Sequence, residues 1–112
     1  MNTDTAFQKS YDFYKNLYIN LRQIPKRDRF TWGERCELLA LELLRSISRA
    51  TYASRPSKQS LLNIASDAVD MLKIYLRLGI ELHILSQRHG IDRQAELQEL
   101  GKMLGGWIKN AG

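Results

Sequence analysis

The sequence predicts an all-α fold, and within that class an antiparallel up-down-up-down four-helix bundle. Apolar residues recur at spacings of three and four along four long segments, the period of a helix with one buried face. Only two prolines occur, Pro25 and Pro56, and both fall between these segments. The connections are short, and short connections join antiparallel neighbours in a bundle. We therefore expect one domain over residues 1–112.

The first helix is expected over residues 4–24. An apolar row with spacings of four, three, four and three marks one face of it: Phe7, Tyr11, Tyr14, Tyr18 and Leu21. Rows of this kind usually pack in a core, so we expect these aromatic rings to be buried, with Phe13, Leu17 and Ile24 widening the row. Pro25 ends the helix because it disfavours the helical conformation of the residue before it.

The second helix is expected over residues 32–53. Thr31 and Glu34 have the spacing of a capping box, in which each side chain accepts a hydrogen bond from the other residue's amide. Leucines at 38, 41 and 44 leave most of the circumference of this helix apolar. Such a helix is either central in the bundle or also buried against another chain.

The third helix is expected over residues 58–89 and the fourth over residues 92–109. Ser57 is a favourable N-cap for the third helix, and Gly90 suits the left-handed residue that follows its end. Asp92 is expected to cap the fourth helix. Gly79 lies inside the third helix at a cost of about 1 kcal/mol relative to alanine, which indicates close packing there.

Composition excludes several classes of site. No apolar run approaches the roughly 20 residues of a membrane-spanning helix, and the N-terminal residues lack the pattern of a signal peptide. Together with the single cysteine, Cys36, this predicts a cytoplasmic protein without a membrane partner.

His83 and His89 are six residues apart and do not form a helical metal pair. We expect no catalytic residues, no metal and no cofactor.

The basic residues are the candidate binding site. The net charge is +5, which favours an anionic partner such as nucleic acid. We expect two patches that contact phosphates, one at the first connection and one along the second and third helices: Arg22, Lys26, Arg27, Arg29 and Arg35, then Arg45, Arg49, Lys73 and Arg77. The alternatives are ordinary solvent-exposed charges or, for Arg29 and Arg35, bonds to helix ends or acids within the chain, with Trp32 packing over the connection.

Motifs along most of the chain resemble those of the accessory variability determinant (Avd) of diversity-generating retroelements. They are Tyr11-Asp12-Phe13, Leu17-Tyr18, Pro25-Lys26, Arg29-Phe30-Thr31-x-Gly33-x-Arg35, Tyr75-Leu76-Arg77-Leu78 and Gly101-x-Met103-Leu104-Gly105-Gly106-Trp107. The resemblance implies a four-helix protomer in a ring-shaped homopentamer with no catalytic activity of its own. It also implies a basic surface that binds nucleic acid (template RNA, possibly DNA) and the reverse transcriptase, in support of mutagenic retrohoming.

A second function class stays open. The chain can instead be a structural helical oligomer, or a relative of the four-helix proteins encoded in ribosomal RNA intervening sequences, that acts through protein–protein contacts.

Overall fold

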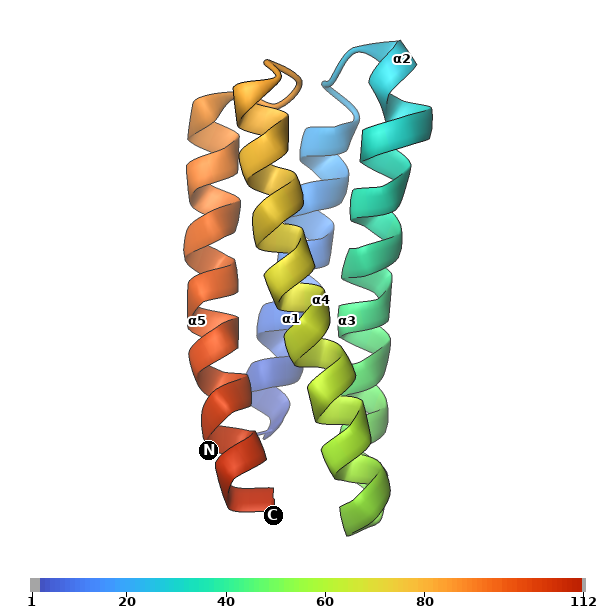
Figure 1. Cartoon of the computed structure of the whole chain (residues 1–112), viewed down its shortest axis with the longest axis vertical. Coiled ribbons are helices and arrows are strands. Elements are labelled where there is room, and N and C mark those ends of the chain that lie inside the picture. The colour runs from blue at the N-terminus through green and yellow to red at the C-terminus, as the bar shows by residue number, and fades with distance from the viewer. Residues whose placement is uncertain (1–2, 112) are drawn as a thin grey trace.

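The computed structural model describes residues 3–111, with side chains over residues 5–110, and this part of the chain contains helices but no strand. Four long helices form a bundle of 42 × 22 × 19 Å, which confirms the predicted fold (Figure 1). A short α-helix and a π-helical segment precede the second long helix. The elements are α1 (Thr3–Leu21), α2 (Lys26–Asp28), η1 (Arg29–Gly33), α3 (Glu34–Tyr52), α4 (Arg55–Glu81) and α5 (Gln87–Ala111).

The four long helices alternate in direction, as Figure 1 shows. α1 packs against α3 and α5, and α4 packs against the same two helices, so α1 and α4 occupy opposite corners of the bundle. The connection from α1 to α3 therefore lies at the same end as the connection from α4 to α5. The core is filled by leucines and small residues from all four helices around Phe13, including Leu43, Leu72 and Leu100.

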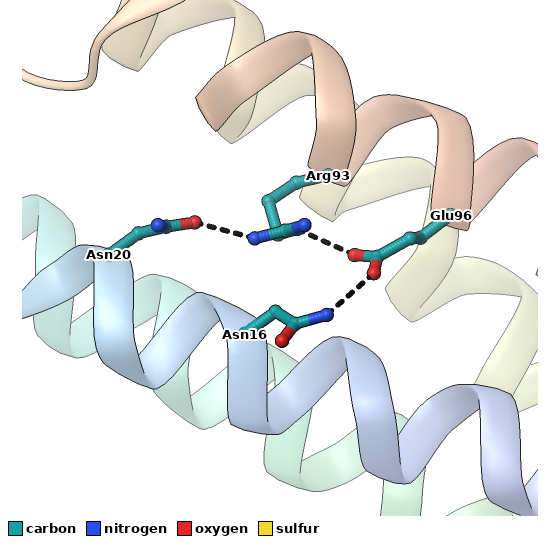
Figure 2. Close-up of polar contacts among 4 residues, drawn as sticks. All are labelled: Asn16, Asn20, Arg93 and Glu96. Atoms are coloured by element: carbon teal, nitrogen blue, oxygen red, sulfur yellow. Dashed lines mark hydrogen bonds and ion pairs between the residues drawn. The ribbon is translucent and has the colours of Figure 1, made fainter. Parts of the chain in front are cut away.

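Polar side chains join α1 to α5 beside this core (Figure 2). The guanidinium of Arg93 donates to Glu96 Oε1 over 2.6 Å and to Asn20 Oδ1 over 2.8 Å, and the Asn16 amide donates to Glu96 Oε2 over 2.8 Å. Further along the same contact, Lys9 pairs with Glu99. Every buried side-chain nitrogen and oxygen in the described residues has a hydrogen-bond partner.

The capping box predicted at Thr31 and Glu34 is wrong. Helical structure begins at Lys26, directly after Pro25, and continues through η1 into α3, while α1 already ends at Leu21. The Thr31 hydroxyl lies within this stretch and donates to the carbonyl of Asp28 over 3.5 Å. Tertiary packing explains the difference, because the buried Trp32 side chain anchors η1 on α4 through a 2.8 Å bond from Nε1 to the carbonyl of Tyr75.

The predicted bounds of the third and fourth helices are also wrong. α4 begins at Arg55, so Ser54 rather than Ser57 is its N-cap. It ends at Glu81, where His83 adopts the left-handed conformation (φ 60°) that the sequence assigned to Gly90. The next helix is capped by Ser86, whose hydroxyl accepts from the amide of His89, and not by Asp92.

Gly90 instead lies inside α5, where it permits close packing. A Cβ atom at this position would lie 2.3 Å from Ile80 Cδ1 of α4. The prediction that Gly90 is a left-handed residue at a helix end is therefore wrong, since the glycine permits contact between two helices and does not adopt a positive φ angle.

The aromatic row predicted to be buried on α1 lies mainly at the surface. Phe7, Tyr11 and Tyr18 are 37%, 48% and 44% exposed, whereas Phe13 and Leu17 are buried. The buried face of α1 also includes Ser10 and Asn20, whose polar side chains find partners. This correction leaves a row of aromatic rings available on the outside of the bundle.

Candidate nucleic-acid interface

The first group of basic residues gathers at one end of the bundle. Arg22 follows α1, Lys26 and Arg27 form the start of α2, Arg29 begins η1, and Arg35 lies in the first turn of α3. All five are exposed. They come together because α1 ends at Leu21 and the chain resumes a helix after only four residues.

Arg29 is bonded within the chain. Its guanidinium donates to the carbonyl of Arg22 over 2.6 Å and to the carbonyl of Ile24 over 3.4 Å. The last carbonyls near a helix end have no partners within the helix, and a positively charged donor satisfies them. The internal role that the sequence left open for Arg29 is therefore the one observed, and Trp32 packs at the same connection.

Replacing Arg29 should reduce the stability of the fold, and not only the positive charge available for binding. We expect Arg29→Ala to lower the free energy of unfolding by about 1–3 kcal/mol, because two carbonyls lose a charged donor. Lys26→Ala is the matched control and should stay within about 0.5 kcal/mol of wild type. Denaturant titration of both variants measures this. An Arg29→Ala protein as stable as the control would contradict the internal role.

The other members of the group keep their charges available. Among residues 5–110, no ion pair forms at Arg22, Lys26 or Arg35. Arg27 lies 3.8 Å from Asp28 and its side chain is 90% exposed, so this contact contributes little. A surface hollow of about 310 Å³ beside them is lined by Tyr18, Leu21, Arg22, Arg29, Gly33 and Glu37.

Arg35 faces a different hollow of about 260 Å³ on the outside of α3. Phe30, Thr31, Glu34 and Leu38 line it with Arg35. The first group therefore spans two neighbouring surfaces at one end of the bundle rather than a single concave site.

The second predicted group is divided between two faces. Lys73 donates to Gln98 of α5 over 3.3 Å, which places it on the side of α4 that faces α5. Arg77, four residues on, pairs with Glu81 at 3.3 Å. Arg45 and Arg49 are exposed on α3, which is the other helix that packs against α4. The structure does not bring these four residues into one patch.

Other chemically active side chains are either buried or isolated. Burial raises the pKa of the Cys36 thiol to about 12, so it is a poor nucleophile. Within the described residues, no three side chains of histidine, cysteine, aspartate or glutamate converge in a way that could hold a metal ion. None of the helices over these residues has an apolar stretch long enough to span a bilayer.

Exposed aliphatic side chains form a second surface feature, on α3 and α4. The sequence indicated an excess of apolar residues on α3 only. The outer side of α4 carries Ile64, Met71, Ile74 and Leu78, each at least 40% exposed. On α3, Leu38 and Leu41 are also exposed, in agreement with the excess of apolar residues noted there. We call the four α4 residues the aliphatic stripe.

The sequence of the chain was compared with family models and with curated proteins. A family model described as bAvd-like matches residues 6–111, which is nearly the whole chain. A search of curated proteins gave no match.

Proposed function

Because the chain belongs to the bAvd-like family, we propose that it is a non-catalytic accessory protein of a diversity-generating retroelement. In this role it binds nucleic acid and the reverse transcriptase of the element through a basic surface in the cytoplasm and supports mutagenic retrohoming. One observation carries the nucleic-acid part of the proposal. Arg22, Lys26 and Arg27 present exposed cations at one end of the bundle, without strong internal partners among residues 5–110.

The electrostatics favour an assembly over a single chain. Affinity for a polyanion rises steeply with the number of phosphates neutralised together, because each contact releases counterions. One chain offers only a few cations in this region and a net charge of +5. Assembly into a homopentamer would raise the formal charge to +25 and present five copies of the basic end.

The aliphatic stripe supports assembly through this face. Ile64, Met71 and Leu78 are spaced seven residues apart on α4, so they align along one face of the helix. Burial of such side chains stabilises subunit contacts by about 25 cal/mol per Å² of apolar area. Light scattering should give a mass five times the 13.0 kDa of one chain, and a monomer would contradict this part of the proposal.

The basic end can be tested by the salt dependence of binding. We expect Lys26→Ala/Arg27→Ala to bind RNA and DNA more weakly at every sequence, and to reduce the slope of log affinity against log salt by about two units. Lys109→Ala, at the opposite end of the bundle, is the control and should leave the slope unchanged. Fluorescence anisotropy over a range of salt concentrations measures both. A wild-type protein whose binding does not depend on salt would end the proposal.

The second function class is a structural oligomer that contacts protein only. The exposed aliphatic stripe favours this class as much as it favours a nucleic-acid-binding assembly, because both require contacts between subunits. The two classes differ in one measurement, because a purely structural oligomer would fail to shift RNA or DNA even at low salt.

A further inference from the structure

The aromatic side chains of α1 border a groove between α1 and α3. Its volume is about 380 Å³ and its lining is mostly aromatic or apolar, with one cation at the edge: Tyr11, Tyr14, Lys15, Tyr18, Ile19 and Leu44. The Tyr14 hydroxyl donates to Glu37 over 3.3 Å, which fixes this ring and occupies the nearby carboxylate. Phe7 extends the same row, with its ring centroid 6.2 Å from that of Tyr11.

Rings and cations alternate along the exposed side of this helix. Lys15 Nζ lies 5.9 Å from the ring centroid of Tyr11, and the guanidinium carbon of Arg22 lies 5.9 Å from that of Tyr18. Each cation follows its ring by four residues, or about 6 Å along the helix axis. Lys15 also lies 3.9 Å from Asp12, but its side chain is 59% exposed, so the pairing is weak.

This alternation fits one class of ligand. A single strand of nucleic acid presents unpaired bases that stack on aromatic rings, and a phosphate backbone that requires cations close by. A duplex keeps its bases stacked internally and offers no base face to a surface ring. The aliphatic stripe of α4, on the opposite corner of the bundle, contains no ring and cannot replace this interaction.

Continuity with the basic end supports the same assignment. Arg22 lies over Tyr18 and also lines the hollow at the basic end, next to Arg29. The aromatic row therefore reaches the end of the bundle where α2 carries Lys26 and Arg27, and one strand could follow both surfaces. A row of rings that ends in exposed cations suits a polyanion better than it suits an apolar protein surface.

We propose that the α1 face is a single-strand binding track, on which bases stack on Tyr11 and Tyr18 while phosphates contact Lys15 and Arg22. The inference rests on the proposed nucleic-acid binding. It adds that the ligand is a single strand, and it names the side chains that contact its bases and phosphates. Stacking is tolerant of sequence, because every base has a π face, so the track selects strand form rather than sequence.

Substitution of the rings by leucine tests the track. Tyr11→Leu/Tyr18→Leu keeps the surface apolar and removes no cation, so the salt slope should stay unchanged. Its affinity for single-stranded RNA or DNA should fall by roughly tenfold or more, whereas affinity for a duplex of the same sequence should change less than twofold. Tyr11→Phe/Tyr18→Phe keeps the rings and should bind single strands as the wild type does.

The outcomes separate this inference from the proposed function. If the wild type binds neither form of nucleic acid at low salt, the proposed function fails. If the wild type binds but the leucine variant loses nothing, or loses affinity for duplex and single strand equally, the track is overturned. Light scattering on the same variant completes the test, since a changed mass would make the aromatic face a subunit contact and would also overturn the track.

Discussion

Gly79→Ala is expected to lower the free energy of unfolding by about 2 kcal/mol, although alanine is the better helix former. A Cβ atom at Gly79 would lie 2.3 Å from Cζ2 and 2.9 Å from Cε2 of Trp32. The indole cannot easily move away, because it is buried and its Nε1 is bonded to the carbonyl of Tyr75. The added methyl group therefore forces apart the contact between η1 and α4, at the end of the bundle that carries the basic residues.

Gly105→Ala is the matched control, with the same chemical change in a different setting. A Cβ atom at Gly105 would meet nothing within 4 Å, so this variant should be more stable by about 1 kcal/mol. Denaturant unfolding at one protein concentration, with the mass checked by light scattering, measures both variants without a contribution from altered assembly. Equal effects of the two substitutions would show that the indole does not press on the helix.

The architecture could be predicted because helical periodicity survives in every segment. Residues such as Leu43, Leu72 and Leu100 repeat on one face of each helix, and their burial follows from that repeat. The helix ends could not be predicted with the same security. Thr31 and Asp92 have the residue types of caps, but packing of Trp32 and capping by Ser86 determine where the helices begin.

The orientation of α1 shows a different limit. Two rows on this helix have helical spacing, and the sequence favoured the aromatic one because of its size. The row that is buried contains the polar residues Ser10 and Asn20 besides Phe13 and Leu17. Judged from the sequence, it therefore looks less apolar than the aromatic row. Nothing local reveals that Asn20 has a partner 73 positions away in Arg93. An amphipathic tyrosine is compatible with either position, so the choice depended on tertiary contacts.

The same limit applies to the candidate site. Sequence can place Arg22, Lys26, Arg27 and Arg29 in one short stretch, and the structure shows Arg29 in contact with the backbone of Arg22. Only the folded backbone shows that Arg29 alone is directed at two carbonyls. The division of Lys73 from Arg45 likewise depends on which helix lies on each side of α4.

Arg93→Met is expected to lower the free energy of unfolding by about 2–3 kcal/mol. The Arg93 and Glu96 side chains are only 12% and 23% exposed, and with Asn16 and Asn20 they join the first helix to the last (Figure 2). Methionine keeps most of the apolar stem but leaves the buried Asn20 oxygen without its donor and the Glu96 carboxylate with Asn16 as its remaining partner. Most of this loss comes from leaving these buried polar groups without a partner, and less of it from the attraction between Arg93 and Glu96.

A double-mutant cycle separates these two contributions. Once Arg93 is methionine, Glu96→Gln should cause little further loss, because it removes the unpaired charge, so the two substitutions should be non-additive by at least about 1 kcal/mol. Arg77→Met breaks an exposed pair with Glu81 by the same chemical change and should cost no more than about 0.5 kcal/mol. If Arg93→Met and Arg77→Met unfold at the same denaturant concentration, the contact between α1 and α5 does not depend on this network, and apolar packing alone holds the two helices together.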